Sequence, residues 1–430
     1  MCRHGEVVFC SGTSEPEAGI PSRPRGHRTV EQNCRAAVEQ LGHLLDTFGD
    51  DAVRVGEDAK IPYGPVWCGD RVLSMCDGDY IAAPVTAVPA EIGAFTGERI
   101  ALQPVERVHI TTLVDNTLDL LAADAGPAKR HPLGAWPRRP ATGDQRQAVV
   151  DELVDGPVGE HGFSALVDVE LAGGDWHRVL FDAGISPDGM VNNMGRLGLA
   201  PDSIEVVVCS HGHFDHTTGL DGLARALGGH ANLPVLIHPE FWSQRRIALP
   251  GREPFDMPVT SRGALQDVGF DIIERPEPSF LFGASVLITG EVARTTDFEK
   301  GMAVHQALRN GSWKPDPLIL DDQALVVHLR DRGLVVLTGC GHAGIVNTVR
   351  YARALTGVEH VHAVLGGFHL TGKVFEPIIG PTVDGLAALA PEVVLPAHCT
   401  GWQAMHQLAN QLLHAFIPNS IGTRLELAAA

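Results

Sequence analysis

Three histidines and one aspartate lie within residues 210–216 of this chain, namely His211, His213, Asp215 and His216. The apolar residues 204–208 precede them and read as a buried strand, so the cluster is predicted to lie on the loop that leaves this strand. The first two histidines are two residues apart and can share one face of an extended backbone, whereas the aspartate and the last histidine follow after a turn. Imidazole and carboxylate groups suit zinc, iron or manganese. The spacing therefore predicts two metal ions side by side.

Three further histidines follow predicted strands at other points of the chain. They are His342 after residues 334–337, His369 after residues 361–365, and His398 after residues 393–395. A single histidine at a strand end is often a structural or solvent-exposed residue. The repeated order of strand, small residues and histidine indicates one shared site, because ligands collect at strand ends in α/β folds.

On these motifs the chain resembles the metallo-β-lactamase-fold hydrolases, whose signature is His-x-His-x-Asp-His. The resemblance extends from about Arg107 to the C-terminus. It is narrower to the branch of dihydropterin (methanopterin-pathway) synthase-like proteins, through residues 113–116, 160–164, 180–184, 338–345, 366–370 and 398–401. Thr218 and Gly341 depart from the residues common in that branch, glycine and serine respectively. The resemblance implies an α/β fold, a four-layer αβ/βα sandwich, with metal ions in the groove at the edge between the two sheets.

The resemblance also implies ligands for two divalent metal ions, for which zinc is our choice and manganese or iron are alternatives. The predicted metal ligands are His211, His213, Asp215, His216, His342 and His398. His211 and His213 would hold the first ion. Asp215 and His216 would hold the second ion, with His398 as its last ligand. His342 is our choice for the third ligand of the first ion. Cys340 stands where many relatives carry a bridging aspartate or a cysteine ligand, and Asp322 is a further contender.

Asp215 and His369 are the predicted catalytic residues. Asp215 would orient the nucleophile and take up a proton while it coordinates metal, whereas His369 or His161 could contact substrate or donate a proton. Asp182 is expected to orient a ligand histidine through its other ring nitrogen. Arg294 could hold a substrate anion, and a solvated surface arginine is the competing interpretation. The histidines treated as structural are His305, His328 and His414.

These residues predict a dinuclear metal-dependent hydrolase that acts on a small, anionic phosphoester, ester or lactone. A divalent ion lowers the pKa of bound water from about 15.7 to about 7, which supplies hydroxide at neutral pH. One alternative is an iron-dependent redox enzyme of the same fold, since the signature does not distinguish between the metals. A second alternative is a non-catalytic metal-binding or scaffold protein. A structural zinc site has four protein ligands, whereas a catalytic site keeps an open position.

Composition restricts the partners of the chain. Its 430 residues carry a formal net charge of −19, which argues against a nucleic-acid-binding surface. There is no apolar stretch of about 18 residues, so no membrane span is expected. The eight cysteines form no Cys-x-x-Cys pair, and reduced thiols in the cytoplasm are the expectation. A small-molecule substrate is the predicted partner. The Ala-, Gly- and Arg-rich composition is common in high-GC bacteria.

Residues 1–105 are predicted to form a smaller N-terminal α+β domain, and residues 106–430 the metal-binding domain. Residues 7–12, a helix over residues 32–49 and residues 82–90 resemble the Rid-type reactive-intermediate deaminases. Val85 stands where that family usually carries an arginine for a substrate carboxylate. We therefore expect this domain to mediate docking or homo-oligomer formation rather than deamination.

Alternating apolar segments predict strands and helices along the rest of the chain. Residues 100–105 are expected to form a strand. Residues 251–278 are expected to form a polar, loop-rich insertion of the kind that often covers a site.

Overall fold

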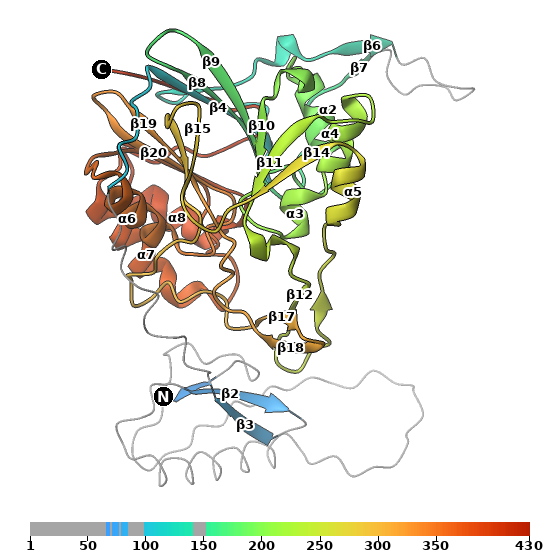
Figure 1. Cartoon of the computed structure of the whole chain (residues 1–430). Coiled ribbons are helices and arrows are strands. Elements are labelled where there is room, and N and C mark those ends of the chain that lie inside the picture. Colours follow the sequence, from blue (N-terminus) through green and yellow to red (C-terminus); the bar gives the residue numbers. More distant parts are fainter. Residues whose placement is uncertain (1–65, 69–70, 77–78, 85–98, 141–151) are drawn as a thin grey trace, which may run out of the picture. The chain divides into compact units, whose positions relative to one another are not determined.

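The computed structural model describes residues 66–68, 71–76, 79–84, 99–140 and 152–430 (Figure 1). The chain divides into two compact units, residues 1–87 with 248–254, and residues 88–247 with 255–430. The predicted domain boundary at residues 105 and 106 stays a prediction. No helix of the described part is long and apolar enough to cross a membrane.

In the first unit the structure describes a three-stranded antiparallel sheet. Its strands are β1 (Val66–Cys68), β2 (Arg71–Cys76) and β3 (Asp79–Pro84), in the order β1-β2-β3. The helix over residues 32–49, the segment 7–12 and Val85, on which the Rid-type resemblance depends, lie outside the described residues.

The second unit is built on two large sheets. The eight-stranded sheet has the order β14 (Phe270–Glu274), β11 (Leu233–Ile237), β10 (Val206–Val208), β9 (Trp176–Phe181), β8 (Ser164–Glu170), β4 (Arg107–Val114), β23 (Arg424–Ala428), β5 (Ala128–Lys129). The six-stranded sheet has the order β15 (Ser279–Leu281), β16 (Val286–Ile288), β19 (Leu325–Leu329), β20 (Gly333–Thr338), β21 (Val361–Gly367), β22 (Val393–Ala397). A short hairpin of β6 (Arg138–Pro140) and β7 (Glu152–Val154) stands apart.

The two large sheets pack face to face because their strands alternate two sets of apolar side chains. Val167 and Phe181 of the eight-stranded sheet share one core with Val335 and Leu337 of the six-stranded sheet. Residues one position along, such as Leu166, belong to a different core that faces helices. Successive strand residues point to opposite faces, so strands buried on both faces need apolar residues throughout.

Helices cover the outer face of each sheet (Figure 1). Those on the eight-stranded sheet are α2 (Gly189–Arg196), α4 (Leu220–Ala226) and α5 (Arg262–Asp267). Those on the six-stranded sheet are α6 (Ile345–Thr356), α7 (Glu376–Leu389) and α8 (Trp402–Gln411). The result is four layers in the order helix, sheet, sheet, helix, which is the sandwich that the resemblance implied.

Two expectations about elements are corrected by the structure. Residues 100–105 form no strand, since only Val105 makes an isolated bridge, to Leu329. Residues 251–278 are not merely loop: they include β13 (Phe255–Asp256), α5 and β14. Leu265 of α5 and Phe270 of β14 are buried against the eight-stranded sheet, so apolar anchors outweigh the polar composition of this segment.

The second unit also contains a small four-stranded antiparallel sheet. Along the chain, its strands come between strands of the two large sheets. Its order is β13, β12 (Arg245–Ile247), β17 (His305–Arg309), β18 (Ser312–Pro315). No expectation from the sequence included this sheet.

Candidate metal centre

The predicted ligands meet at the ends of strands from both large sheets. Strands β9 and β10 are parallel neighbours, and so are β20, β21 and β22. Parallel strands bring their carboxyl ends to one edge, so the residues that follow them become neighbours. The gathered residues are Asp182 after β9, 210–216 after β10, 339–342 after β20, 368–369 after β21, and His398 after β22.

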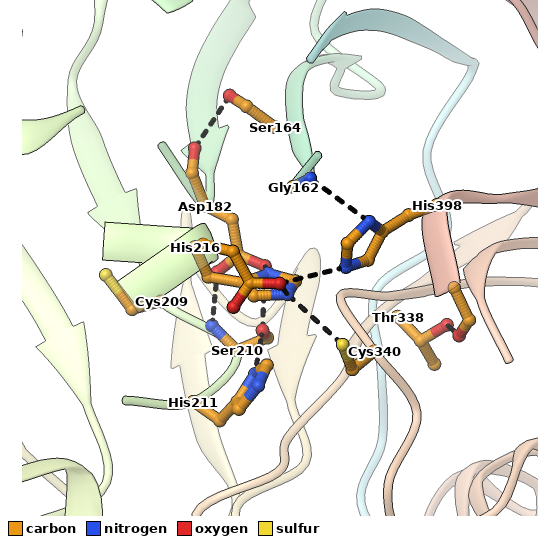
Figure 2. Close-up of polar contacts among 12 residues, drawn as sticks. Gly162, Ser164, Asp182, Cys209, Ser210, His211, His216, Thr338, Cys340 and His398 are labelled. Carbon is orange, nitrogen blue, oxygen red and sulfur yellow. Dashed lines mark hydrogen bonds and ion pairs between the residues drawn. The ribbon is translucent and has the colours of Figure 1, made fainter. Parts of the chain in front are cut away.

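Asp182 orients the ligand histidine His216, the role predicted for it (Figure 2). Its carboxylate accepts hydrogen bonds from the backbone N–H of Ser210 at 2.6 Å and from the Ser210 hydroxyl at 2.7 Å. The same carboxylate lies 2.7 Å from Nδ1 of His216. Since a carboxylate only accepts, Nδ1 of His216 carries a proton, and Nε2 is directed away from Asp182.

Ser210 extends this arrangement to His211. Its hydroxyl proton is committed to Asp182, and its oxygen lies 2.9 Å from Nδ1 of His211. The oxygen can therefore only accept from that nitrogen, which leaves the lone pair of the His211 ring on Nε2. Asp182 itself adopts φ 59°, a sparsely populated conformation for a residue other than glycine. Such strain is typical of functional sites.

Cys340 lies at the middle of the cluster. Its Sγ is 3.2 Å from Nε2 of His216 (Figure 2). Two sets of potential ligand atoms, each set within 4.8 Å, share this thiol: His211, Cys340 and His342 form one, and His216, Cys340 and His398 the other. Cys340 is thus common to both sets, and the two contenders Cys340 and His342 lie in one set with His211.

Several buried ligand atoms have no hydrogen-bond partner among the described residues. These are Nε2 of His211, Nε2 of His342 and Oδ1 of Asp322. A buried polar atom without a partner costs free energy, so native proteins pair such atoms with protein, water or an ion. Donor atoms of nitrogen, oxygen and sulfur left in this state fit divalent metal ions.

Burial also sets the protonation of the cluster. Burial lowers the pKa of His211, His213 and His342 well below the usual range, so these imidazoles stay neutral and keep a lone pair. Burial alone would raise the pKa of Asp215, but the neighbouring His216, together with His161, outweighs burial and keeps the carboxyl ionised. Metal ligands need this state, because protons compete with metal for the same atoms.

His398 is fixed by a separate set of contacts. Its backbone N–H donates to Asp115 at 2.7 Å, and its Nδ1 lies 3.3 Å from the N–H of Gly162 and 3.2 Å from Oδ1 of Asn116. Its Nε2 lies 3.4 Å from the carboxylate of Asp215. The structure therefore brings His398, Asp215 and His216 together, as predicted for the second ion.

Asp322 stays a contender as a ligand. One of its carboxylate oxygens accepts from the backbone N–H of Ala343 at 2.8 Å, and the other has no partner among the described groups. Burial raises the pKa of this carboxyl to about 6. A nearby cation would compensate the buried charge.

His213 is the predicted ligand that departs most from the expected arrangement. Its ring centre is 4.5 Å from that of His211 and 5.0 Å from that of His342. However, its Nε2 lies 3.0 Å from Nε2 of His305, a residue that the sequence treated as structural without a site context. His305 is thus a neighbour of the site that sequence reasoning missed.

Cys399 was also missed, although it directly follows His398. Its Sγ is 3.4 Å from Sγ of Cys340, and both are free thiols. Cys399, Cys340 and His369 hold potential ligand atoms within 4.8 Å of one another. His369 adopts φ 43°, and its ring centre is 4.1 Å from that of His342.

The remaining two candidates differ in outcome. His161 lies at the surface of the cluster, with 58% of its side chain exposed and Nε2 at 3.4 Å from Asp215. The hydrogen bond to Asp215 raises the pKa of His161. Arg294 is mostly buried, and its guanidinium donates to the backbone carbonyls of His342, Glu299 and Leu318. Three of its five N–H donors therefore bind carbonyls, so Arg294 is not a solvated surface arginine, and its anion-holding role stays a prediction.

Known proteins are similar to this chain. Residues 163–355 match the model of the Metallo-beta-lactamase superfamily. A 7,8-dihydropterin-6-methyl-4-(beta-D-ribofuranosyl)-aminobenzene-5'-phosphate synthase of Methanocaldococcus jannaschii is 29% identical over 263 residues, 60% of this chain and 86% of that protein. An uncharacterized protein of the same organism is 29% identical over 264 residues, 61% of this chain and 92% of that protein.

A solved structure agrees with the architecture. Tm1679, described as a metal-dependent hydrolase of the beta-lactamase superfamily, matches with a TM-score of 0.54 and 24% identity, over 75% of this chain and 99% of that chain. The chain therefore carries a metallo-β-lactamase superfamily domain, as the His-x-His-x-Asp-His signature indicated. Within the superfamily, its relatives include the synthase of the branch that the sequence motifs resembled.

Proposed function

We propose that this chain is a dinuclear metal-dependent hydrolase of a small anionic substrate, with a phosphoester as first candidate and an ester or lactone next. The observation that carries the proposal is the convergence of buried nitrogen, oxygen and sulfur atoms on Cys340, with the outer nitrogens of His211 and His216 already held by hydrogen bonds. Such pre-orientation is the pattern of a metal site that has to keep its ligands in place.

The donor set fits two divalent ions. The first ion would be held by His211 and His342, with His213 adjacent, and the second by Asp215, His216 and His398. Cys340 would lie between them, with Asp322 as a further ligand. When bound, the ions supply hydroxide at neutral pH and stabilise negative charge on the attacked group. A site of six to eight protein ligands for two ions keeps positions for water and substrate, which favours an enzyme over a structural site.

The side chains around the ions divide the remaining work. Asp215 stays ionised and can accept a proton from the attacking group at its carboxylate. His161 is the exposed neighbour of Asp215, and its raised pKa favours the protonated ring, so it can donate a proton to a leaving group. His369 lies against His342 and can contact substrate on the other side.

The phosphoester is placed first because of a relative. The Methanocaldococcus jannaschii synthase is named for a product that carries a 5'-phosphate. That relative is a synthase, so the proposal of hydrolysis rests on the site rather than on its name.

The test is metal content together with turnover. Protein purified without chelator should contain about two zinc or manganese ions per chain by mass spectrometry, and His211→Ala and His398→Ala should each contain less. His414→Ala is the matched control, because His414 is exposed. Asp215→Ala should lower turnover of phosphoester or lactone substrates by about 100-fold or more while circular dichroism stays unchanged.

Three results would contradict this proposal. Unchanged turnover in Asp215→Ala would exclude the role of that carboxylate. Bound iron with oxygen-dependent turnover would favour the redox alternative. Well-folded protein without bound metal would favour a binding or scaffold protein.

A further inference from the structure

The small sheet of β12 and β17 contributes two side chains to the back of the metal cluster. His305 begins β17 and is fully buried, and Arg245 begins β12 with 2% of its surface exposed. The two strands are antiparallel neighbours, with Arg245 opposite Ala307 and Ile247 opposite His305. Neither residue belongs to the predicted ligand set.

Resting on the proposed metal centre, we infer that His305 is a positioning residue that fixes the tautomer of His213. Nδ1 of His305 lies 3.0 Å from the backbone carbonyl oxygen of Asp316. A carbonyl oxygen only accepts, so this nitrogen carries a proton, and in the neutral form of the ring the lone pair is on Nε2. That nitrogen is the one that lies 3.0 Å from Nε2 of His213.

The orientation of His213 follows from this contact. With a lone pair on Nε2 of His305, Nε2 of His213 has to carry the proton and donate it. The lone pair of His213 is then on Nδ1, the nitrogen that remains available for a metal ion. His213 would thus bind metal through the opposite nitrogen from His211, whose lone pair is on Nε2.

Arg245 closes the arrangement into a ring of hydrogen bonds. Its Nε donates to the carboxylate of Asp316 at 3.1 Å, and its Nη1 donates to Asp321 at 2.8 Å. The same oxygen of Asp321 accepts from the backbone N–H of Gly212 at 2.8 Å. Gly212 and His213 are adjacent in the loop of residues 210–216. The contacts therefore lead from His213 through the small sheet and return to the same loop at Gly212.

This ring of hydrogen bonds is buried, which indicates a structural role beside the metal cluster. An arginine hidden from water is costly unless carboxylates pair with it, and here two carboxylates do so. Gly212 is also confined, because a side chain at this position would meet the Phe241 carbonyl oxygen at 2.0 Å. The small sheet therefore holds the loop that carries His211 and His213 from one side.

The competing reading is that His305 is itself a metal ligand through Nε2. The two interpretations differ in which substitution at position 305 preserves metal binding. Glutamine offers a carbonyl oxygen that can accept from Nε2 of His213, but it is a poor substitute for an imidazole ligand. Leucine offers neither function.

The experiment uses the full chain with His305→Gln, His305→Leu and the exposed control His414→Leu. Zinc affinity is measured by competition with a chromophoric chelator. We expect His305→Leu to weaken binding of one ion by about 10- to 100-fold, as is typical when a partner of a ligand histidine is lost. His305→Gln and His414→Leu should stay within about threefold of the unmodified chain.

A second measurement does not depend on metal binding. Nitrogen-15 spectra of histidine-labelled, metal-free protein, assigned with a His213→Gln variant, should show the proton of His213 on Nε2. This result keeps the inference testable if zinc does not bind or if His305→Leu does not fold. A proton on Nδ1 of His213 would overturn the inference, as would equal loss of affinity in His305→Gln and His305→Leu, or no loss in either.

Discussion

At the scale of single residues, hydrogen bonds to the Nδ1 atoms orient three imidazole rings of the site. Asp182 holds His216, Ser210 holds His211, and Asn116 with Gly162 holds His398. These contacts fix the orientation of each imidazole ring before any ion arrives. A ligand that does not have to reorient loses less conformational entropy on binding.

The charge around His216 gives a prediction about pH. Burial alone would lower the pKa of His216, but the carboxylates of Asp182 and Asp215 outweigh burial and raise the pKa to about 9 in the metal-free chain. A pKa raised above the unfolded value of about 6.5 stabilises the fold fully below pH 6.5. This stabilisation is lost as pH rises through about 9. For a shift of this size it amounts to at most about 3 kcal/mol.

The matched variant is Asp182→Asn, which keeps the shape and removes the charge. In urea unfolding of chelator-treated protein, the unmodified chain should exceed the variant in free energy of unfolding at pH 6.5. The difference should shrink between pH 7 and pH 9.5. A difference that does not vary with pH would show that Asp182 does not control the protonation of His216.

His305 shows which residues a sequence pattern cannot reveal. The histidines after strands were predictable, because a strand and the loop that leaves it are local in sequence. The contact between His213 and His305 spans 92 positions and depends on the pairing of β12 with β17. His305 has no motif around it, and only the assembled sheet brings it to the site.

At the scale of elements, the ends of strands from two sheets approach closely at glycines. Gly339 follows β20, and a Cβ atom built there would lie 2.1 Å from the Ser210 hydroxyl and 2.4 Å from the carboxylate of Asp182. Real side chains do not approach this closely. The absence of a side chain at position 339 therefore lets the loop after β20 pass beside the loop after β10.

Gly339→Ala should displace Asp182 and Ser210 from His216 and His211. We expect a loss of about 1–3 kcal/mol in the free energy of unfolding, the usual cost of overpacking. Metal content should fall as well. Urea denaturation and mass spectrometry of metal content measure the two effects.

The control for this variant is Gly195→Ala in α2, where a Cβ atom meets nothing within 4 Å. There the substitution should be neutral or stabilise the chain by up to about 1 kcal/mol, because alanine favours helix over glycine. Equal losses in both variants, or unchanged metal content in Gly339→Ala, would contradict the close approach of the two loops.

The same scale explains what was predictable about the fold. The apolar run of residues 361–365 predicted most of β21 (Val361–Gly367), because the strand is buried on both faces. Strand β23 alternates exposed and buried residues over only Arg424–Ala428 and received no prediction. Its place depends on antiparallel pairing with β4, more than 300 positions earlier in the chain.

At the scale of the whole second unit, the proposed ions connect its two sheets. Asp215 and His216 follow strand β10 of the eight-stranded sheet, whereas Cys340 and His398 follow strands β20 and β22 of the six-stranded sheet. The sheets also share an apolar core, so the fold does not depend on metal alone. Bound metal should nevertheless stabilise the folded unit, because the unfolded chain does not hold these ligands together.

Removal of metal should therefore lower the melting temperature of the full chain. An ion present at about 100 times its dissociation constant stabilises by about 2.7 kcal/mol. At about 2–4 °C per kcal/mol, the loss of one such ion corresponds to a decrease of about 5–10 °C. Differential scanning calorimetry before and after chelator treatment, and after zinc is restored, measures this change. Because His211→Ala and His398→Ala each remove a ligand from a different sheet, chelator should shift their melting temperatures less than that of the unmodified chain, and the same shift in all three would show that the ions do not bind between the sheets.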